Sequence, residues 1–280
     1  MSVVAFWSNE EKETGQTMSM VALSTYMAIE HNFRILNVSA NFKDDTLERS
    51  YWDLTKEGKL AKTLSNNSNQ IGFESGLEGL VKIINSNKTT NNIVSNYTKV
   101  VFKERLDVLC ATKTRVYEEY KQIADLYPTI LQVADKSYDY VFIDVSKKMP
   151  EEQMKEILEI ADVVIVNIVQ KLAVIDEIAK LRQENSFFNK SNIILNIGRY
   201  DKFSKYNIKN ITRYLGLKKN VNVIPYNTLF FEACSEGKVA EFFLKLRRLD
   251  PEDRNAIFVS EIGRLAKDLI YKIQELQLKR

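Results

Sequence analysis

Cysteine and histidine are scarce in this chain of 280 residues, which contains two cysteines and one histidine. The spacing of Cys110 and Cys234 fits neither a metal clip nor a disulfide framework. With His31 as the single imidazole, a histidine-rich metal site is excluded, and a Ser-His-Asp triad would have to use this one residue. The chain therefore does not belong among histidine-based zinc proteins or disulfide-stabilised folds.

Long apolar runs and an excess of one charge are also missing. No segment approaches the roughly 18 uninterrupted apolar residues of a membrane span, and Met1 leads directly into an apolar segment rather than a basic one. The 40 basic and 37 acidic residues leave a net charge of +3, which gives no global field for nucleic acid or an anionic membrane. We therefore expect a cytoplasmic protein that reaches the inner face of the membrane only through partners.

Short apolar runs alternate with helical segments along most of the chain. Strands that are apolar throughout, rather than at every second residue, indicate a mostly parallel sheet covered on both faces. We predict a doubly wound α/β fold of one domain over residues 1–250, with residues 251–280 as a C-terminal helix on the same domain. The predicted strands are Val3–Trp7, Ile35–Val38, Leu106–Leu109, Tyr140–Ile143, Val163–Ile168, Ile193–Ile197 and Val221–Ile224.

Two regions depart from this alternation. Within residues 42–105, polar runs at 65–70 and 85–92 predict surface loops around a helix near Gly76–Ile84. Later, Asp250-Pro251-Glu252 is a helix start signal that precedes apolar residues on one face, so we expect one helix from Pro251 onward. Packing of this helix on the sheet is the simplest interpretation, and a membrane-surface helix is the alternative.

The segment before the first predicted helix, Thr17–Glu30, has the layout of a P-loop, in which backbone N–H groups and a helix N-terminus bind an anion. The usual Gly-Lys-Ser/Thr is here Gly15-Gln16-Thr17, so an amide replaces the lysine that would neutralise phosphate charge. The loop also carries three carboxylates, which would repel a triphosphate unless Lys12 or a metal ion compensates. These carboxylates are Glu10, Glu11 and Glu13. The layout predicts a nucleotide-hydrolase scaffold with damaged chemistry.

Five motifs, taken in order, resemble those of the MinD/ParA class of deviant-Walker ATPases over most of residues 1–245. Within that class the chain is most similar to the TadZ/CpaE branch, the ParA-like proteins of tight-adherence pilus systems, whose P-loops often lack the lysine. The resemblance implies a P-loop NTPase-like fold, ATP or ADP with Mg²⁺ as cofactor, and a homodimer. The motifs are Ser8 with Gly15-Gln16-Thr17, Tyr138–Asp144, Ala161–Val166, Ile193–Asn196, and Ile224–Asn227 with Ala233 and Gly237.

The resemblance assigns Mg²⁺ to Thr17 and Asp144, with Asp144 acting through water. A strand-end aspartate that bonds nearby backbone is the alternative for Asp144. Asn41 stands where the family has the aspartate that orients the attacking water, and Ser39 stands at the preceding acidic position. Because an amide cannot accept a proton, this change and Gln16 together favour very slow or absent hydrolysis. The implied phosphate-side residues are Lys12, Thr14, Gly15, Gln16, Thr17 and Met18.

Two further positions follow from the resemblance. The family's signature lysine, which reaches the partner subunit's nucleotide, falls on Glu11 by direct counting and on Lys12 after a shift of one residue, and both alignments stay open. On the base side, Asn196 matches the asparagine that recognises the adenine edge, and Pro225 and Tyr226 belong to the second base-side loop. Capping of a turn is the alternative role for Asn196.

These features together indicate a ParA/MinD-like nucleotide-binding or pseudo-ATPase protein that dimerises and organises or localises a pilus or secretion assembly. One alternative is an active but atypical Mg-ATPase. The other is a DNA-binding partition protein, whose basic clusters at 202–213 and Lys245–Arg248 would neutralise phosphates. Acidic residues are interspersed through the chain, so DNA is the less favoured partner.

Overall fold

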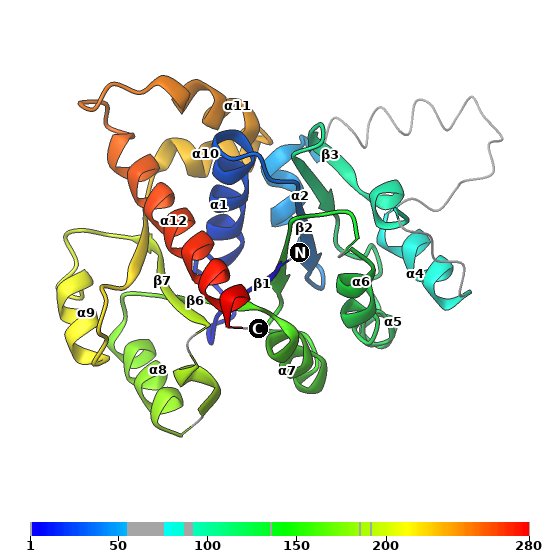
Figure 1. Cartoon of the computed structure of the whole chain (residues 1–280), viewed down its shortest axis with the longest axis horizontal. Coiled ribbons are helices and arrows are strands. Elements are labelled where there is room, and N and C mark those ends of the chain that lie inside the picture. The colour runs from blue at the N-terminus through cyan, green and yellow to red at the C-terminus, as the bar shows by residue number, and fades with distance from the viewer. Residues whose placement is uncertain are drawn as a thin grey trace.

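The computed structural model describes residues 2–54, 76–86, 92–134, 136–184, 186–190 and 192–279. A sheet of eight strands runs through these residues in the order β3-β4-β2-β5-β1-β6-β7-β8 (Figure 1). Every neighbouring pair is parallel except β3 and β4, which are antiparallel. The strands are β1 (Ser2–Trp7), β2 (Ile35–Ala40), β3 (Lys99–Phe102), β4 (Leu106–Leu109), β5 (Tyr140–Val145), β6 (Val163–Ile168), β7 (Ile193–Tyr200) and β8 (Asn222–Pro225).

Alternate residues of β1 enter two different hydrophobic cores, one on each face of the sheet. Val3, Ala5 and Trp7 pack in the first core, and Val4 and Phe6 pack in the second. A strand buried on both faces needs apolar residues at every position, which is why these runs show no alternation. The predicted doubly wound, mostly parallel α/β fold in one domain is confirmed.

Helices cover both faces of the sheet. One face carries α1 (Gln16–Glu30), α2 (Thr46–Tyr51), α10 (Thr228–Glu236), α11 (Val239–Lys245) and α12 (Ala256–Leu278). The other carries α4 (Leu77–Asn85), α5 (Tyr117–Ala124), α6 (Tyr127–Ala134), α7 (Glu151–Ile160), α8 (Leu172–Glu184) and α9 (Ile208–Tyr214). Short 3₁₀ turns lie at Val94–Tyr97, Ser186–Asn189 and Leu246–Arg248.

The C-terminal helix α12 crosses the front of the molecule beside α1 (Figure 1). Its inward face buries apolar side chains, including Phe258, Ile262 and Leu269. A Cβ atom at Gly263 would lie only 2.8 Å from the Tyr26 hydroxyl of α1, so the absence of a side chain lets the two helices approach closely. The helix is thus part of the second core.

One sequence-based helix boundary was wrong, and one strand was missed. The C-terminal helix begins at Ala256 and not at Pro251, because Asp250 and Asp253 each accept a hydrogen bond from a backbone N–H two residues later and so hold turns in place of helix. Strand β3 was missed altogether. It forms a hairpin with β4 through a turn whose positive φ of 60° falls on Glu104 rather than on glycine or asparagine, so the usual turn signal is lacking.

Four strands continue further than predicted, to Ala40, Val145, Tyr200 and Pro225. The sheet register pairs Ser39 with Asp144, so polar residues that do not look like strand residues still belong to the ladder. The predicted helix near Gly76–Ile84 is confirmed as α4. The polar run 65–70 and residues 87–91 of the second polar run lie outside the described residues.

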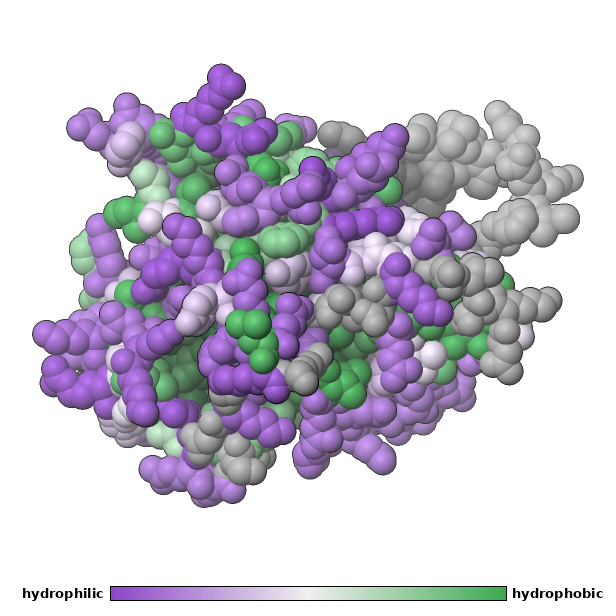
Figure 2. Space-filling view, in the orientation of Figure 1, coloured by the Kyte–Doolittle hydropathy of each residue, from purple (hydrophilic) through white to green (hydrophobic). Residues whose placement is uncertain are grey.

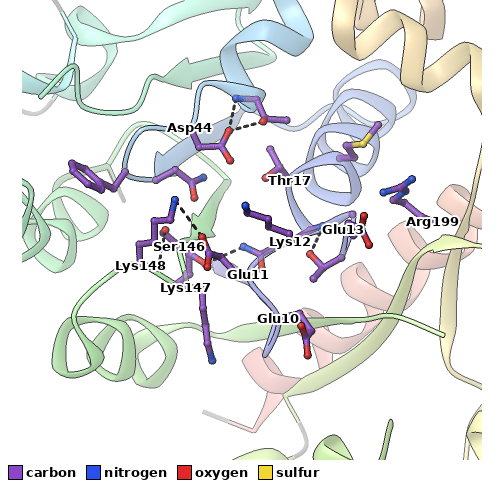
Figure 3. Close-up of a pocket in the computed structure, with 18 residues that line it drawn as sticks. Glu10, Glu11, Lys12, Glu13, Thr17, Asp44, Ser146, Lys147, Lys148 and Arg199 are labelled. Carbon is purple, nitrogen blue, oxygen red and sulfur yellow. Dashed lines mark hydrogen bonds and ion pairs between the residues drawn. The ribbon is translucent and has the colours of Figure 1, made fainter. Parts of the chain in front are cut away.

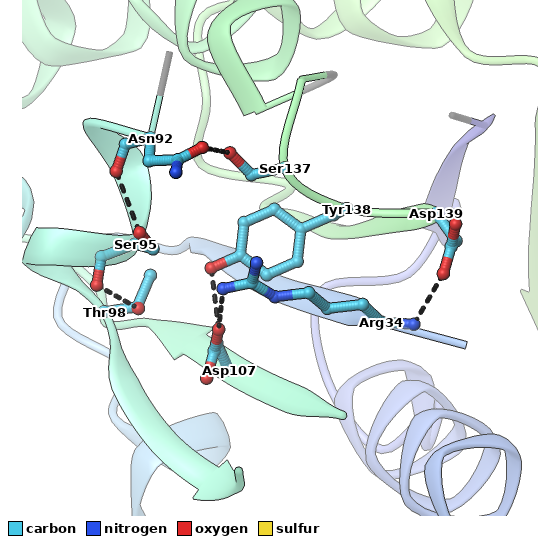
Figure 4. A network of polar contacts seen from close by, with 8 residues as sticks. All are labelled: Arg34, Asn92, Ser95, Thr98, Asp107, Ser137, Tyr138 and Asp139. Carbon is cyan, nitrogen blue, oxygen red and sulfur yellow. Dashed lines mark hydrogen bonds and ion pairs between the residues drawn. The ribbon is translucent and has the colours of Figure 1, made fainter. Parts of the chain in front are cut away.

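A polar network ties together the ends of β4 and β5 that lie opposite the P-loop (Figure 4). Asp107 is buried and accepts a hydrogen bond of 2.8 Å from the Tyr138 hydroxyl and a longer one of 3.5 Å from the Arg34 guanidinium. That guanidinium also lies 4.7 Å from the centre of the Tyr138 ring. Burial, followed by the charge of Asp107, raises the pKa of Tyr138 above its usual range, so the hydroxyl remains a donor at neutral pH.

The surface seen in Figure 2 is mostly hydrophilic, with hydrophobic residues scattered singly or in small groups. Within the described ranges, no helix combines the length and the apolar character needed to cross a bilayer.

Candidate functional site

The loop between β1 and α1 lies at the carboxyl ends of the parallel strands, where α/β folds place their ligands. Gly15 precedes α1 with a φ of 69°, a left-handed conformation that favours glycine. The loop, the residues after β2 and the residues after β5 line a cleft of about 290 Å³ (Figure 3). The predicted residues Lys12, Thr14, Gly15, Gln16, Thr17, Met18 and Asn41 all line it.

Asp144 lies beneath the residues that line this cleft and does not line it itself, being fully buried near the end of β5. Its Oδ1 accepts a hydrogen bond of 2.7 Å from the Gln16 amide, and its Oδ2 accepts bonds from the Thr17 hydroxyl at 2.6 Å and the Asn41 amide at 2.7 Å. The Gln16 amide also donates to the Val145 carbonyl at 3.0 Å. Burial raises the pKa of Asp144, while the three hydrogen bonds act in the opposite direction.

This network brings together four residues to which the sequence assigned three roles: phosphate charge, water orientation and magnesium binding. Gln16, which replaces the P-loop lysine, turns back to Asp144. Asn41, at the predicted water-orienting position, holds the same carboxylate. Thr17 and Asp144, the predicted magnesium pair, are in direct contact. Among the described residues, the Asp144 carboxylate therefore accepts its hydrogen bonds from side chains, and not from the backbone as in its alternative role.

The loop carboxylates are less repulsive than the sequence alone indicates. Glu11 forms an ion pair of 3.3 Å with Lys148, which follows β5, and Glu13 forms one of 3.6 Å with Lys171, which follows β6. Both pairs are solvent-exposed, so each contributes little to stability. Their effect is on the local charge, because two of the three carboxylates now have a cation beside them.

The end of β7 presses directly against the loop. A Cβ atom at Gly198 would lie 2.2 Å from the Thr14 carbonyl oxygen, closer than any side chain tolerates. The next residue, Arg199, has a φ of 56°, which few residues other than glycine adopt. Its side-chain stem packs over Gly15, where an added Cβ would lie 3.0 Å from the Arg199 Cγ.

The expected base side of the site has two parts. Pro225 and Tyr226 line an open cleft of about 760 Å³ beside the loop, and they also line a cavity of only about 20 Å³ against the start of α1. Asn196, by contrast, is fully buried, and its amide donates to Ser19 Oγ at 3.2 Å and Asn167 Oδ1 at 2.8 Å. The structure thus brings Pro225 and Tyr226, but not the Asn196 side chain, to the clefts.

Two other residues of the base-side motif stabilise the two ends of α10. The Asn227 side chain caps α10 by accepting a hydrogen bond of 2.9 Å from the Phe230 backbone N–H. Gly237 ends the same helix with a φ of 72°, and a Cβ there would lie 2.5 Å from the backbone of Trp52. The motif therefore fixes the ends of α10 beside α2.

Several residues of the cleft were missed from the sequence. Most come from loops that follow strand ends, while Arg199 is near the end of β7 and Thr46 begins α2. The signal that could have found them is this position at the carboxyl edge of a parallel sheet. Lys147 and Lys148 follow β5 by two and three residues, and Arg199 follows the predicted end of β7 by two. The missed lining residues are Phe42, Asp44, Thr46, Val145, Ser146, Lys147, Lys148 and Arg199.

Comparison with known proteins shows that this chain is similar to solved structures in its fold. No family model and no curated protein matches the sequence. A ParA family ATPase from Chlorobium tepidum TLS matches the structure with a TM-score of 0.65 at 17% sequence identity, covering 95% of this chain and 98% of the other.

Two further solved structures were determined with nucleotide. The septum site-determining protein MinD from Pyrococcus horikoshii OT3, complexed with Mg-ADP, has a TM-score of 0.62 at 15% identity, with 97% of this chain and 98% of the other covered. A putative plasmid partition protein from Borrelia burgdorferi B31, bound to AMPPNP, has a TM-score of 0.56 at 18% identity, with 99% and 98% covered. The predicted MinD/ParA-type P-loop fold is thereby confirmed.

Proposed function

We propose that this chain is a P-loop protein of the MinD/ParA type that binds a nucleoside di- or triphosphate but does not turn it over. The amide network on Asp144 carries the proposal. Phosphoryl transfer depends on a cation at the phosphates and on a residue that positions the attacking water. Here the two replacement amides, Gln16 and Asn41, both hold Asp144.

The retained architecture supports binding. The left-handed Gly15 leads into the start of α1, the loop-and-helix arrangement in which backbone N–H groups bind phosphate, although here the Gln16 N–H donates to the Thr14 hydroxyl at 3.2 Å. Proteins of the same fold were crystallised with Mg-ADP and with AMPPNP.

The donor set also fits a magnesium ion that arrives with the nucleotide. Thr17 and Asp144 offer oxygen atoms, the ligands that Mg²⁺ prefers, and Mg²⁺ at nucleotide sites takes its remaining ligands from phosphates and water. Within the described ranges, no cluster of three histidine, cysteine or acidic side chains could hold a metal ion by itself. Asp144 would have to exchange an amide hydrogen bond for a bond to metal-bound water.

The test compares the wild-type protein with a Gln16→Lys/Asn41→Asp double variant. The wild type is expected to melt at a higher temperature with ADP or Mg-ATP, because a ligand that binds only the folded state stabilises it. Its ATP hydrolysis should stay at the protein-free rate. The double variant regains the cation and the carboxylate and should hydrolyse ATP faster than the wild type.

Gln153→Lys is the matched control, because it adds the same charge on α7, where the Gln153 amide contacts Asp125. It should behave as the wild type. Wild-type turnover that Asp144→Ala abolishes would contradict the proposal and favour an active, atypical Mg-ATPase. Equal melting with and without nucleotide would contradict nucleotide binding.

We further propose that the protein dimerises and organises or localises a pilus or secretion assembly. This role follows from the resemblance to the TadZ/CpaE branch, in which the P-loop lysine is also often absent. A protein that binds nucleotide without hydrolysing it acts by binding other molecules, so we expect it to act on partner proteins. Salt-sensitive binding to DNA of any sequence would instead favour a partition protein.

A further inference from the structure

Arg199 lies where the phosphate side and the base side of the site meet. It lines the 290 Å³ cleft around the P-loop, the 760 Å³ cleft beside it and the small cavity against α1. In Figure 3 it stands at the edge of the P-loop cleft, opposite Lys147 and Lys148. The P-loop has an amide at Gln16 and no cation there, so the charge that balances a phosphate has to come from other residues of the cleft.

The other cations of the cleft are mostly engaged. Lys148 is paired with Glu11, and Lys147 lies 5.5 Å from the centre of the Trp7 ring. Lys12 lies between Glu11 and Glu13 in the sequence, but these two carboxylates pair with Lys148 and Lys171, and Lys12 makes no ion pair among the described residues. Arg199 makes no ion pair among the residues that the structure describes, and its guanidinium only faces the Tyr226 ring at 5.7 Å.

The backbone holds Arg199 in this place. Gly198 packs against the Thr14 carbonyl, which brings the end of β7 onto the loop. Arg199 then adopts a φ of 56°, a conformation that costs free energy and is retained mostly where a site requires it. A guanidinium presents several N–H donors in a plane and binds phosphate oxygens in pairs.

We propose that Arg199 supplies the phosphate-binding charge that Gln16 no longer provides, so that the anion of a nucleoside polyphosphate is held by a cation from β7 rather than from the P-loop. The inference deepens the proposed function and rests on it. It assigns Arg199 to the phosphate groups, and not to the base, of the bound nucleotide.

The test measures binding of ADP, adenosine and inorganic tripolyphosphate by calorimetry to the wild type, Arg199→Gln, Arg199→Lys and Arg254→Gln. Arg199→Gln should weaken ADP and tripolyphosphate binding roughly tenfold to a hundredfold, the range for a lost charged hydrogen bond, and leave adenosine unchanged. Arg199→Lys keeps the charge and should retain most of the affinity. Arg254 is exposed and lines only the neighbouring cleft, so Arg254→Gln should match the wild type.

The outcomes separate the two proposals. If the wild type binds ADP and both glutamine variants bind it equally well, the role of Arg199 is overturned while the proposed function stands. Equal losses for adenosine and ADP, or a loss in Arg199→Lys as large as in Arg199→Gln, would also overturn a phosphate-charge role. If the wild type binds tripolyphosphate through Arg199 but binds no nucleotide, the proposed function is overturned while the anion site at Arg199 stands. If the wild type binds neither tripolyphosphate nor nucleotide, both the proposed function and the role of Arg199 are overturned. Circular dichroism spectra of the variants should match the wild type, because Arg199 is exposed.

Discussion

Glu48 is a buried carboxyl group at a short distance from the candidate site, on α2. It is only 5% exposed and accepts a hydrogen bond from the Ala111 backbone N–H, while its Oε2 has no hydrogen-bond partner in the described part of the chain. Burial raises the pKa of Glu48 from 4.5 to about 7, and the nearby charges of Asp44 and Asp45 add to the rise. The folded protein therefore favours the protonated form of Glu48.

This raised pKa predicts a loss of stability as the pH rises. Below pH 4.5 the Glu48 carboxyl is protonated in both the folded and the unfolded protein. As the pH rises through about 7, the contribution of Glu48 to the free energy of unfolding is lost, a total of about 3 kcal/mol. Glu48→Gln cannot ionise, so we expect it to be more stable than the wild type at pH 8 and to differ least from it near pH 5. Urea unfolding across this pH range measures the difference. A constant difference between the two proteins at all pH values would contradict the raised pKa.

Residue identities in the site could be predicted from sequence, but their orientations could not. The P-loop layout located Gly15, Gln16 and Thr17, and the cleft contains them. That Gln16 faces Asp144 depends on rotamers and on contacts between residues more than a hundred positions apart, which no local pattern records. The buried Asn196 illustrates the same limit, because a strand-end asparagine can face a ligand or a neighbouring strand equally well.

At the scale of elements, the apolar strands were readily predicted because burial on both faces demands apolar residues at every position. β3 was not, since it is an edge strand with Lys99 and Val100 exposed, and its pairing with β4 is set by the hairpin turn. The start of α12 was misplaced because aspartate side chains stabilise the preceding turns. Element type thus followed from hydrophobic pattern, whereas boundaries depended on individual hydrogen bonds.

The polar network at the ends of β4 and β5, on either side of β2, offers a test at this scale. Tyr138→Phe removes the hydroxyl that donates to buried Asp107 and leaves its carboxylate with the 3.5 Å contact to Arg34. We expect a loss of about 1–3 kcal/mol in the free energy of unfolding. Tyr117→Phe is the control, because its hydroxyl bonds the Lys148 carbonyl at an exposed position and should cost less. Equal losses in urea unfolding would show that the Asp107 network adds nothing specific.

For the whole molecule, the charge of the P-loop face differs from what the loop sequence alone indicates. Glu11 and Glu13 are each paired with a lysine from another strand end, so only Glu10 of the three loop carboxylates makes no ion pair among the described residues. A symmetric dimer through this face would therefore meet less like-charge repulsion than six free carboxylates would produce.

Lys148→Gln tests this arrangement, because it frees Glu11 in both copies. If the copies associate through the P-loop face, the variant dimer should be weaker than the wild type at low ionic strength and recover in high salt, since the screening length falls from about 30 Å at 0.01 M to about 3 Å at 1 M. Lys155→Gln, which breaks the pair with Glu151 on α7, is the control. Sedimentation equilibrium that gives the same dissociation constant for both variants would place the dimer contact on another surface.

The contact between Gly198 and the Thr14 carbonyl also has a mechanical consequence. Because no space separates the two backbones, the loop cannot sink or rise at Thr14 without displacing the end of β7. β7 leads directly into the segment that carries Phe203, whose side chain is 85% exposed. A ligand that shifts the loop at Thr14 would therefore also displace the end of β7 and, with it, the exposed aromatic segment that follows.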